Sequence, residues 1–179
     1  QKKQPGDLGN SLGIAVHPKF EYNAVAVGEE VFILASGLLE EVARKKMPVR
    51  IVTQPQGSGS EASTRLVLEA YGMTYDQIKS WGGSVTPTAT SVVQAQMADG
   101  KADMWINMVV AGHPAISELA MSTDLVFLPM SDEIIKKLEP YGYKKTFLPA
   151  KSFKGQERDV PLIGWPTILA ARKDVKPEV

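Results

Sequence analysis

The sequence contains no cysteine and only two histidines among its 179 residues. Without cysteine, the chain has no disulfide, no thiolate metal site and no cysteine nucleophile. His17 and His113 lie far apart in the sequence, so they do not form a metal-binding pair at helical spacing. We therefore expect no metal, no cofactor and no catalytic residue in this chain.

An excess of one charge is also missing, because Lys and Arg together number 20 and Asp and Glu together number 20. A chain without net charge generates no overall field that would attract nucleic acid, so we expect no nucleic-acid partner. No segment approaches the ~20 consecutive apolar residues that a bilayer-spanning helix needs. The first residue is Gln in a polar segment, which indicates a processed protein or an excised fragment from which an export signal could have been removed.

Strand-like and helix-like segments alternate along the chain. β-Branched and apolar runs predict strands at residues 12–16, 22–27, 49–52, 104–110, 126–128 and 162–171. Apolar residues at helical spacing predict helices within residues 38–42, 62–70, 74–78, 89–97, 114–120 and 131–138, with Ser36, Pro114 and Ser131 at three of the starts. Residues 141–161 show no regular pattern. The alternation predicts an α/β fold with a largely parallel sheet, helices on both faces and ligands beyond the carboxyl ends of the strands.

The loop at residues 53–61 is the most informative segment, because it joins a predicted buried strand to a predicted helix through glycines and hydroxyl groups. Gly57 and Gly59 allow a close approach of the backbone to a ligand. The first N–H groups of the following helix have no partner inside the helix, and they lie at the positive end of its dipole. This arrangement predicts a binding site for a carboxylate or a phosphate.

A purely structural explanation of the same residues also remains open. Ser58 or Ser60 could cap the helix, and Glu61 would then be favourably placed in its first turn. The loop lacks the Gly-Lys-Ser/Thr ending of a P-loop and the spacing of a dinucleotide-binding fingerprint, so nucleotide binding is disfavoured. The order of glycine and serine at residues 57–60 does not fit the nucleophile elbow of a serine hydrolase either.

Five segments, taken in order, resemble the TAXI family of solute receptors, which serve tripartite (TRAP) transporters. The segments are Gln56-Gly57-Ser58-Gly59-Ser60-Glu61-Ala62, Leu68-Glu69-Ala70-Tyr71-Gly72-Met73-Thr74-Tyr75-Asp76, Ala98-Asp99-Gly100-Lys101-Ala102-Asp103, Val109-Val110-Ala111-Gly112-His113-Pro114-Ala115-Ile116 and Gly155-Gln156-Glu157-Arg158-Asp159-Val160-Pro161. The resemblance covers roughly residues 12–174. It favours a binding protein over an enzyme.

The resemblance implies one lobe of a type II periplasmic binding protein fold, in which two α/β lobes joined by hinge strands close over an organic solute. The chain is too short for both lobes, so we expect the second lobe alone, with the first lobe absent. Residues 1–10 would be a flexible lead-in, and residues 11–179 would form a single lobe that includes hinge strands at about 22–27 and 163–171. The resemblance also implies a periplasmic location and TRAP-type permease subunits as membrane partners.

Residue by residue, the resemblance assigns the ligand-binding loop to Gly57, Ser58, Gly59, Ser60 and Glu61. Asn107 ends its predicted strand at the same edge and could offer an amide to the ligand, although asparagine at a strand end often serves a turn. Trp165 near the second hinge strand could form the floor of the cleft, or it could belong to the core.

We therefore expect an extracytoplasmic receptor lobe that captures a small organic anion or an amino acid such as glutamate or glutamine. A ligand-sensing domain of the same fold is an alternative, and an attached helix-turn-helix or kinase segment would identify it. A small transferase that uses the Gly-Ser loop for a phosphorylated substrate is the other alternative, and turnover of a substrate would identify it.

Overall fold

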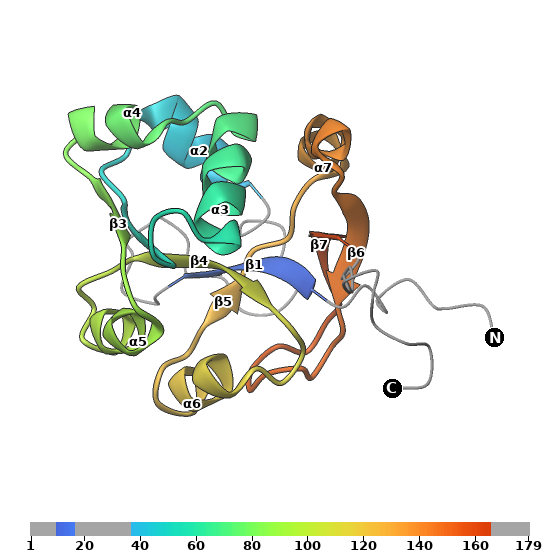
Figure 1. Cartoon of the computed structure of the whole chain (residues 1–179). Helices are drawn as coiled ribbons and strands as arrows, with labels where there is room; N and C mark the ends of the chain where they lie inside the picture. Colours follow the sequence, from blue (N-terminus) through green and yellow to red (C-terminus); the bar gives the residue numbers. More distant parts are fainter. Residues whose placement is uncertain (1–9, 17–36, 166–179) are drawn as a thin grey trace, which may run out of the picture.

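A single seven-stranded sheet organises residues 10–16 and 37–165, which are the residues that the computed structural model describes (Figure 1). The strands are β1 (Asn10–Val16), β2 (Arg50–Thr53), β3 (Ser84–Pro87), β4 (Met104–Val109), β5 (Val126–Phe127), β6 (Lys144–Leu148) and β7 (Val160–Trp165). The helices are α2 (Leu38–Lys45), α3 (Gly59–Ala70), α4 (Tyr75–Ser80), α5 (Thr90–Ala98), α6 (Pro114–Ser122), α7 (Asp132–Leu138) and the short 3-10 helix η1 (Glu139–Tyr141). The predicted α/β class is confirmed.

The strand order is β3-β2-β4-β1-β7-β6, and β5 pairs with β1 beside this path. β2 lies parallel to both β3 and β4, so the carboxyl ends of these three strands meet at one edge. β1 is antiparallel to β4, to β5 and to β7, and β6 is antiparallel to β7. In open α/β sheets, ligands bind at the edge where parallel strands end, so the parallel part of this sheet is where we look for a ligand site.

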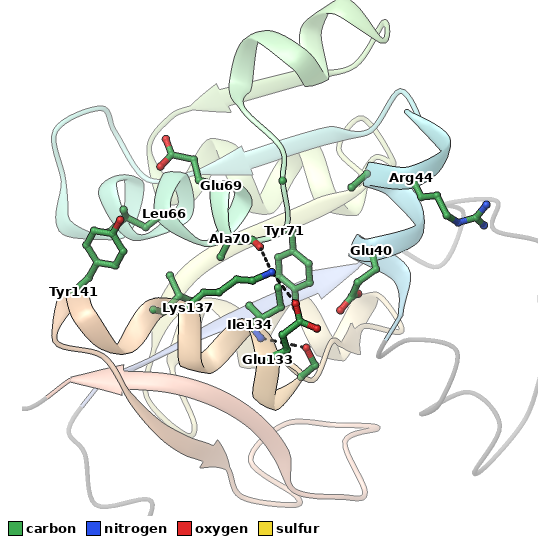
Figure 2. Close-up of a pocket in the computed structure, with 14 residues that line it drawn as sticks. Glu40, Arg44, Leu66, Glu69, Ala70, Tyr71, Glu133, Ile134, Lys137 and Tyr141 are labelled. Atoms are coloured by element: carbon green, nitrogen blue, oxygen red, sulfur yellow. Dashed lines mark hydrogen bonds and ion pairs between the residues drawn. The ribbon is translucent and has the colours of Figure 1, made fainter.

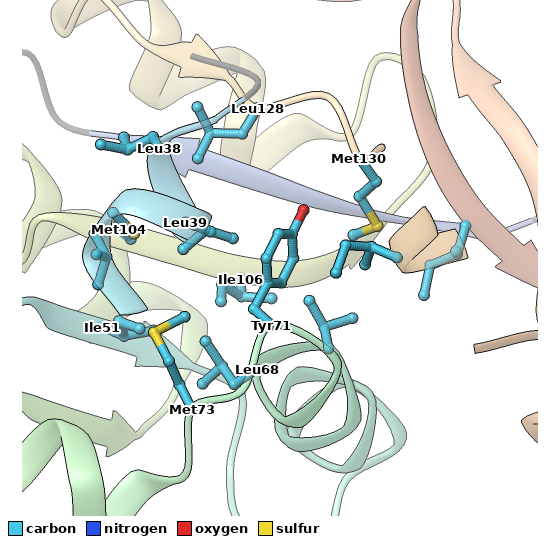
Figure 3. Close-up of a cluster of buried hydrophobic side chains, with 14 of the residues drawn as sticks. Leu38, Leu39, Ile51, Leu68, Tyr71, Met73, Met104, Ile106, Leu128 and Met130 are labelled. Carbon is cyan, nitrogen blue, oxygen red and sulfur yellow. The ribbon is translucent and has the colours of Figure 1, made fainter. Parts of the chain in front are cut away.

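The core consists of two layers of apolar side chains, one on each face of the sheet. Alternate residues of a strand point to opposite faces. Ile51, Met104 and Ile106 accordingly belong to the layer under α2, α3 and α7, whereas Val52 and Trp105 belong to the layer under α5 and α6. Figure 1 shows α2, α3 and α4 on one side of the sheet and α5 and α6 on the other, and Figure 3 shows the first layer. Helices on both faces were predicted and are confirmed.

Several predicted helix boundaries are confirmed by the capping groups. The Ser131 hydroxyl accepts a hydrogen bond from the Ile134 N–H at 3.4 Å, and Pro114 occupies the first turn of α6. The predicted cap at Ser36 is wrong, because the residue that caps α2 is Gly37, without a side-chain hydrogen bond. The predicted strand at residues 22–27 and the second hinge strand beyond Trp165 lie outside the described residues.

The sequence pattern did not predict two of the strands, β3 and β6. β6 lies in the segment that showed no regular pattern, and it is fixed by pairing with β7 from Lys144 opposite Gly164 to Leu148 opposite Val160. β3 is short, with two of its four residues exposed, and within the described residues it pairs with β2 alone. Both strands are specified by their partners rather than by their own apolar residues.

Asp103, the last residue of the Asp-Gly-Lys-Ala-Asp segment, has a structural role, because it connects the start of β4 to the start of β2. Asp103 is 5% exposed. Its carboxylate accepts hydrogen bonds from the Arg50 backbone N–H at 2.7 Å and from Arg50 Nε at 3.0 Å. A second guanidinium nitrogen of Arg50 reaches Asp103 Oδ1 and the Gly100 carbonyl. A neutral replacement would leave these donors poorly satisfied.

Gln156 gives the Gly-Gln-x-x-Asp-Val-Pro segment a structural role. Its buried Nε2 lies within hydrogen-bond distance of the carbonyls of Leu148, Pro149 and Arg158, at 3.3, 2.9 and 2.7 Å. Asp159 accepts from the Ala150 N–H at 2.8 Å. These contacts fasten the connection between β6 and β7.

Replacing Asp103 by Asn should destabilise the protein by about 1.5–3 kcal/mol, because hydrogen bonds to a charged, buried acceptor are lost. Urea denaturation of the wild type and Asp103→Asn measures the difference. Asp99→Asn is the matched control, since the Asp99 carboxylate is exposed and its one ion pair within the described part of the chain is with Lys101 at 2.8 Å. Equal free energies of unfolding for Asp103→Asn and Asp99→Asn would contradict this role.

Candidate functional site

Three helix N-termini meet at the edge where the parallel strands end. α3 follows β2, α5 follows β3 and α6 follows β4, so the first turns of all three helices lie beside the carboxyl ends of these strands. A cavity of about 420 Å³ opens there. Its lining consists of Gln54, Ser58, Gly59, Ser60, Thr90, Asn107, Met108, Val110 and His113. This is the position where open α/β sheets bind ligands.

The first turn of α3 offers two free backbone donors to this cavity. Ser58 is the N-cap, and its hydroxyl accepts from the Glu61 N–H at 3.2 Å. The N–H of Ser58 donates to the Pro55 carbonyl at 3.0 Å. Among the described residues, no acceptor pairs with the N–H groups of Gly59 and Ser60. The capping role and the anion-binding role proposed for this loop are therefore compatible, because they use different N–H groups.

Three side chains in the lining also carry polar groups without a partner in the described part of the chain. Asn107 is 6% exposed, and its amide makes no hydrogen bond with any described residue. The Nε2 atom of Gln54 is buried and unpaired, while its Oε1 accepts from the Thr90 hydroxyl at 3.1 Å. The Nδ1 atom of His113 is buried and unpaired as well. Buried polar atoms are rarely left without a partner, so these groups indicate a site for a polar ligand.

The electrostatic character of the cavity comes from the helix ends. Its lining contains no Asp, Glu, Lys or Arg. The N-cap residues of α5 and α6, Ala89 and His113, make no side-chain cap hydrogen bond. Each helix N-terminus carries a partial positive charge of roughly half an elementary charge. The cavity therefore favours an anion and contains no carboxylate that would repel one.

Buried hydroxyl groups hold the first turn of α3 in place over β2 and β4. Thr64 donates to the Ser60 carbonyl at 2.8 Å and lies 2.8 Å from the Thr53 hydroxyl, which in turn reaches the Ile106 carbonyl at 3.0 Å. The Ser60 hydroxyl accepts from the Met108 N–H at 3.4 Å. Because it accepts this bond, its own hydrogen remains available to a ligand.

The sequence of this site lies within a known family. A family model described as the NMT1-like family matches residues 49–179, which is well over half of the chain. The chain belongs to the NMT1-like family. This is a periplasmic solute-binding family, and membership in it points to an extracytoplasmic solute-binding role. β1 and α2 lie ahead of the matched residues, although α2 contributes buried side chains to the core.

Short stretches of the chain are also similar to isoleucine–tRNA ligases. The ligase of Bacillus subtilis is 51% identical over 39 residues, which are 22% of this chain and 4% of the ligase. The ligases of Shouchella clausii and Thermotoga neapolitana are 39% and 46% identical over 57 and 41 residues, or 6% and 4% of their lengths. The chain thus spans only a few per cent of these curated relatives. The much longer NMT1-like match indicates a binding protein that is not an enzyme.

The structure brings together four of the residues predicted for the site, namely Ser58, Gly59, Ser60 and Asn107. Gly57 lies outside the lining, and its φ of 81° shows that it serves the turn before α3. Trp165 packs edge-to-face on Tyr143 with ring centroids 5.4 Å apart, and it also lies outside the lining. A contact of Gly57 or Trp165 with ligand therefore stays a prediction.

Glu61 points away from the cavity and is held by other protein groups. Its carboxylate accepts from Arg65 at 2.7 Å, from the Tyr75 hydroxyl at 3.1 Å and from the Gly57 N–H at 3.4 Å. Burial would raise the pKa of Glu61, but these hydrogen bonds outweigh it and hold the pKa below its ordinary value of 4.5. In this geometry Glu61 fixes the turn at Gly57, and a contact of Glu61 with ligand stays a prediction.

Sequence reasoning missed Gln54, Thr90, Met108, Val110 and His113 as lining residues. The sequence predicts neither His113 nor Gln54 as a residue that contacts the ligand. One signal could have found Gln54, because it is the first residue after a predicted parallel strand. The contact between Gln54 and Thr90 depends on the pairing of β2 with β3, which the sequence did not predict.

A larger depression lies elsewhere, between α2, the C-terminal half of α3 and α7 (Figure 2). Its volume is about 740 Å³. Lys137 crosses it, paired with Glu133 at 2.9 Å and donating to the Ala70 carbonyl at 3.4 Å. None of the buried, unpaired side-chain atoms found within the described residues belongs to its lining. We therefore assign the site to the smaller cavity.

Two other features do not change this assignment. Gly9-Asn10-Ser11-Leu12-Gly13 has the spacing of a serine nucleophile elbow, but Ser11 lies inside β1, opposite Val109 and Gly164, rather than on a strand-to-helix turn. Among the helices within residues 37–165, none combines the length and the apolar character that a bilayer crossing would need.

Glu61→Gln should lower stability at neutral pH and have a smaller effect in acid. Because the folded-state pKa of Glu61 is lowered, its stabilising contribution is fully present above its unfolded-state pKa and is lost as the pH falls through the folded-state pKa. Urea midpoints of the wild type and Glu61→Gln, measured at neutral pH and roughly one unit below 4.5, should converge in acid.

The matched control for this experiment is Glu133→Gln, because Glu133 is exposed and pairs with Lys137 on the surface. We expect a smaller change at neutral pH for this variant, since surface ion pairs contribute little. A difference between wild type and Glu61→Gln that is the same at both pH values would show that the charge of Glu61 does not stabilise the loop.

Proposed function

We propose that this chain is the ligand-binding lobe of a TAXI-type extracytoplasmic solute receptor that captures a small carboxylate for a TRAP-type transporter. The ligand class is a small organic anion or an amino acid such as glutamate or glutamine. The observation that carries this proposal is one cavity beside three helix N-termini that is lined by Gly59, Ser60, Gln54 and Asn107, each with a donor that no described residue pairs.

The donors match the chemistry of a carboxylate. A carboxylate has two oxygens that accept several hydrogen bonds, and the cavity offers backbone N–H groups, amide groups and the Ser60 hydroxyl. A charged acceptor makes stronger hydrogen bonds than a neutral one, and a helix N-terminus stabilises negative charge further. The neutral lining favours a single carboxylate group at this position.

The free energy available from this lobe alone is small. Each exposed helix terminus contributes about 0.3–1 kcal/mol, and up to about 2 kcal/mol in partly buried geometries. A micromolar complex requires about 8 kcal/mol. We therefore propose that a first lobe supplies the remaining contacts and that closure of the two lobes excludes water and strengthens the charge interactions.

The proposed function also includes a partner protein in the membrane. A receptor that captures solute outside the cytoplasm delivers it to a permease, and we propose TRAP-type permease subunits in that role. The resemblance of the five sequence segments to TAXI receptors and the membership in a periplasmic solute-binding family support this.

Gln54→Ala should weaken carboxylate binding, because it removes an unpaired donor from the cavity. NMR titration of ¹⁵N-labelled chain with L-glutamate, L-glutamine and propionate detects binding even in the millimolar range. We expect a roughly threefold to tenfold loss of affinity, corresponding to one hydrogen bond. The control is Gln56→Ala on the same loop, because Gln56 is exposed and lies outside the cavity lining. Equal effects of the two substitutions would count against the site.

Residues 1–179 should bind the solute much more weakly than a receptor chain that also contains the first lobe. Calorimetric titration of the same carboxylates and amino acids into both proteins measures the difference. Binding that becomes micromolar only with both lobes would support the half-site arrangement. Comparable micromolar affinity in both proteins would refute it.

A further inference from the structure

The buried Nδ1 atom of His113 is the least expected feature of the cavity. His113 is the N-cap residue of α6, a position where a polar side chain usually accepts a hydrogen bond from the second or third N–H of the helix. His113 makes no such bond, although the backbone carbonyl of the same residue accepts from the N–H groups of Ile116 and Ser117 at 3.1 and 2.9 Å. The side chain is therefore not used to cap its own helix.

Leaving a ring nitrogen buried and unpaired costs free energy, so the imidazole of His113 lacks a partner that the described residues do not supply. His113 belongs to the same lining as Asn107, Gln54 and the free N–H groups of Gly59 and Ser60. These other groups are all donors or amides that suit a carboxylate. His113 comes from a different element, after β4, and adds a group of different chemistry.

We propose that His113 is a specificity-determining residue whose imidazole ring binds a second polar group of the ligand. This inference rests on the proposed function, because it assigns the carboxylate of the ligand to the donors of α3, Gln54 and Asn107. The second group is a hydroxyl or a similar group, because a hydroxyl donates to an unprotonated ring nitrogen and accepts from a protonated one. The ligand class is thus a carboxylic acid with a hydrogen-bonding substituent.

The remaining lining residues fit the rest of such a molecule. Met108 and Val110 are apolar, and Val110 is 44% exposed at the rim of the cavity. Neither residue can select between a plain and a substituted carboxylic acid by hydrogen bonding. Discrimination between these two ligands must therefore come from a polar group such as His113.

The test compares L-lactate with propionate, which differ by one hydroxyl group. ¹⁵N-labelled residues 1–179 are titrated with each acid, and the dissociation constants are obtained from the amide signals of the protein. The wild type should bind lactate about fivefold more tightly than propionate, as expected for one additional hydrogen bond. His113→Leu and His113→Phe should reduce this ratio to about one and change propionate affinity by less than about twofold.

Val110→Ala is the control, because it removes an apolar contact and should weaken both ligands alike, leaving the ratio unchanged. Equal affinities of the wild type for lactate and propionate would overturn the role of His113 while leaving carboxylate binding intact. If the His113 variants lost affinity for lactate and for propionate by the same factor, His113 would have only a structural role, and the proposal would also be overturned. Absence of any binding of either acid to residues 1–179 would overturn this inference for the isolated lobe, and only its absence from a two-lobe receptor chain as well would remove the proposed function.

Discussion

Parallel pairing of β2 with β3 and β4 is the constraint on which the site depends. Because these strands run in the same direction, the helices that follow them all begin at one edge of the sheet. Their first N–H groups and their positive dipole ends are brought to one cavity without any charged side chain. The buried hydroxyl groups of Thr53 and Thr64 then hold the first turn of α3 against the ends of these strands.

The site illustrates how stability and function compete within a small cavity. Ser58 and Glu61 satisfy part of the loop with protein groups, which fixes its shape. Gln54, Asn107 and His113 instead keep polar atoms without partners among the described residues. Such atoms cost about 1–3 kcal/mol each when they are buried. Of the four buried side-chain atoms that lack a partner among the described residues, Gln54 Nε2 and His113 Nδ1 belong to residues of this cavity, whereas Trp105 Nε1 and Gln156 Oε1 do not. A ligand is the partner that we propose for the first two.

Much of the parallel part of the fold could be predicted from the sequence, because its signals are local. The strand before residue 54, the helix from residue 59 and the helix start at Pro114 all follow from apolar spacing and capping residues. β6 could not be predicted, since its strand conformation depends on pairing with β7. The antiparallel position of β1 between β4 and β7 likewise follows from contacts between distant segments. For the same reason the sequence predicted Ser58, Gly59, Ser60 and Asn107 for this edge of the sheet, but not Gln54 and His113, which line the same cavity.

The central claim is that a carboxylate occupies the cavity at the start of α3, and a crystal structure with 3-bromopropionate tests it most directly. The bromine atom gives anomalous scattering that locates the ligand independently of the protein phases. We predict density in the cavity, with the carboxylate oxygens within hydrogen-bond distance of the N–H groups of Gly59 and Ser60. A carboxylate bound only in the groove between α2, α3 and α7, with the cavity at Asn107 filled by water, would contradict the account.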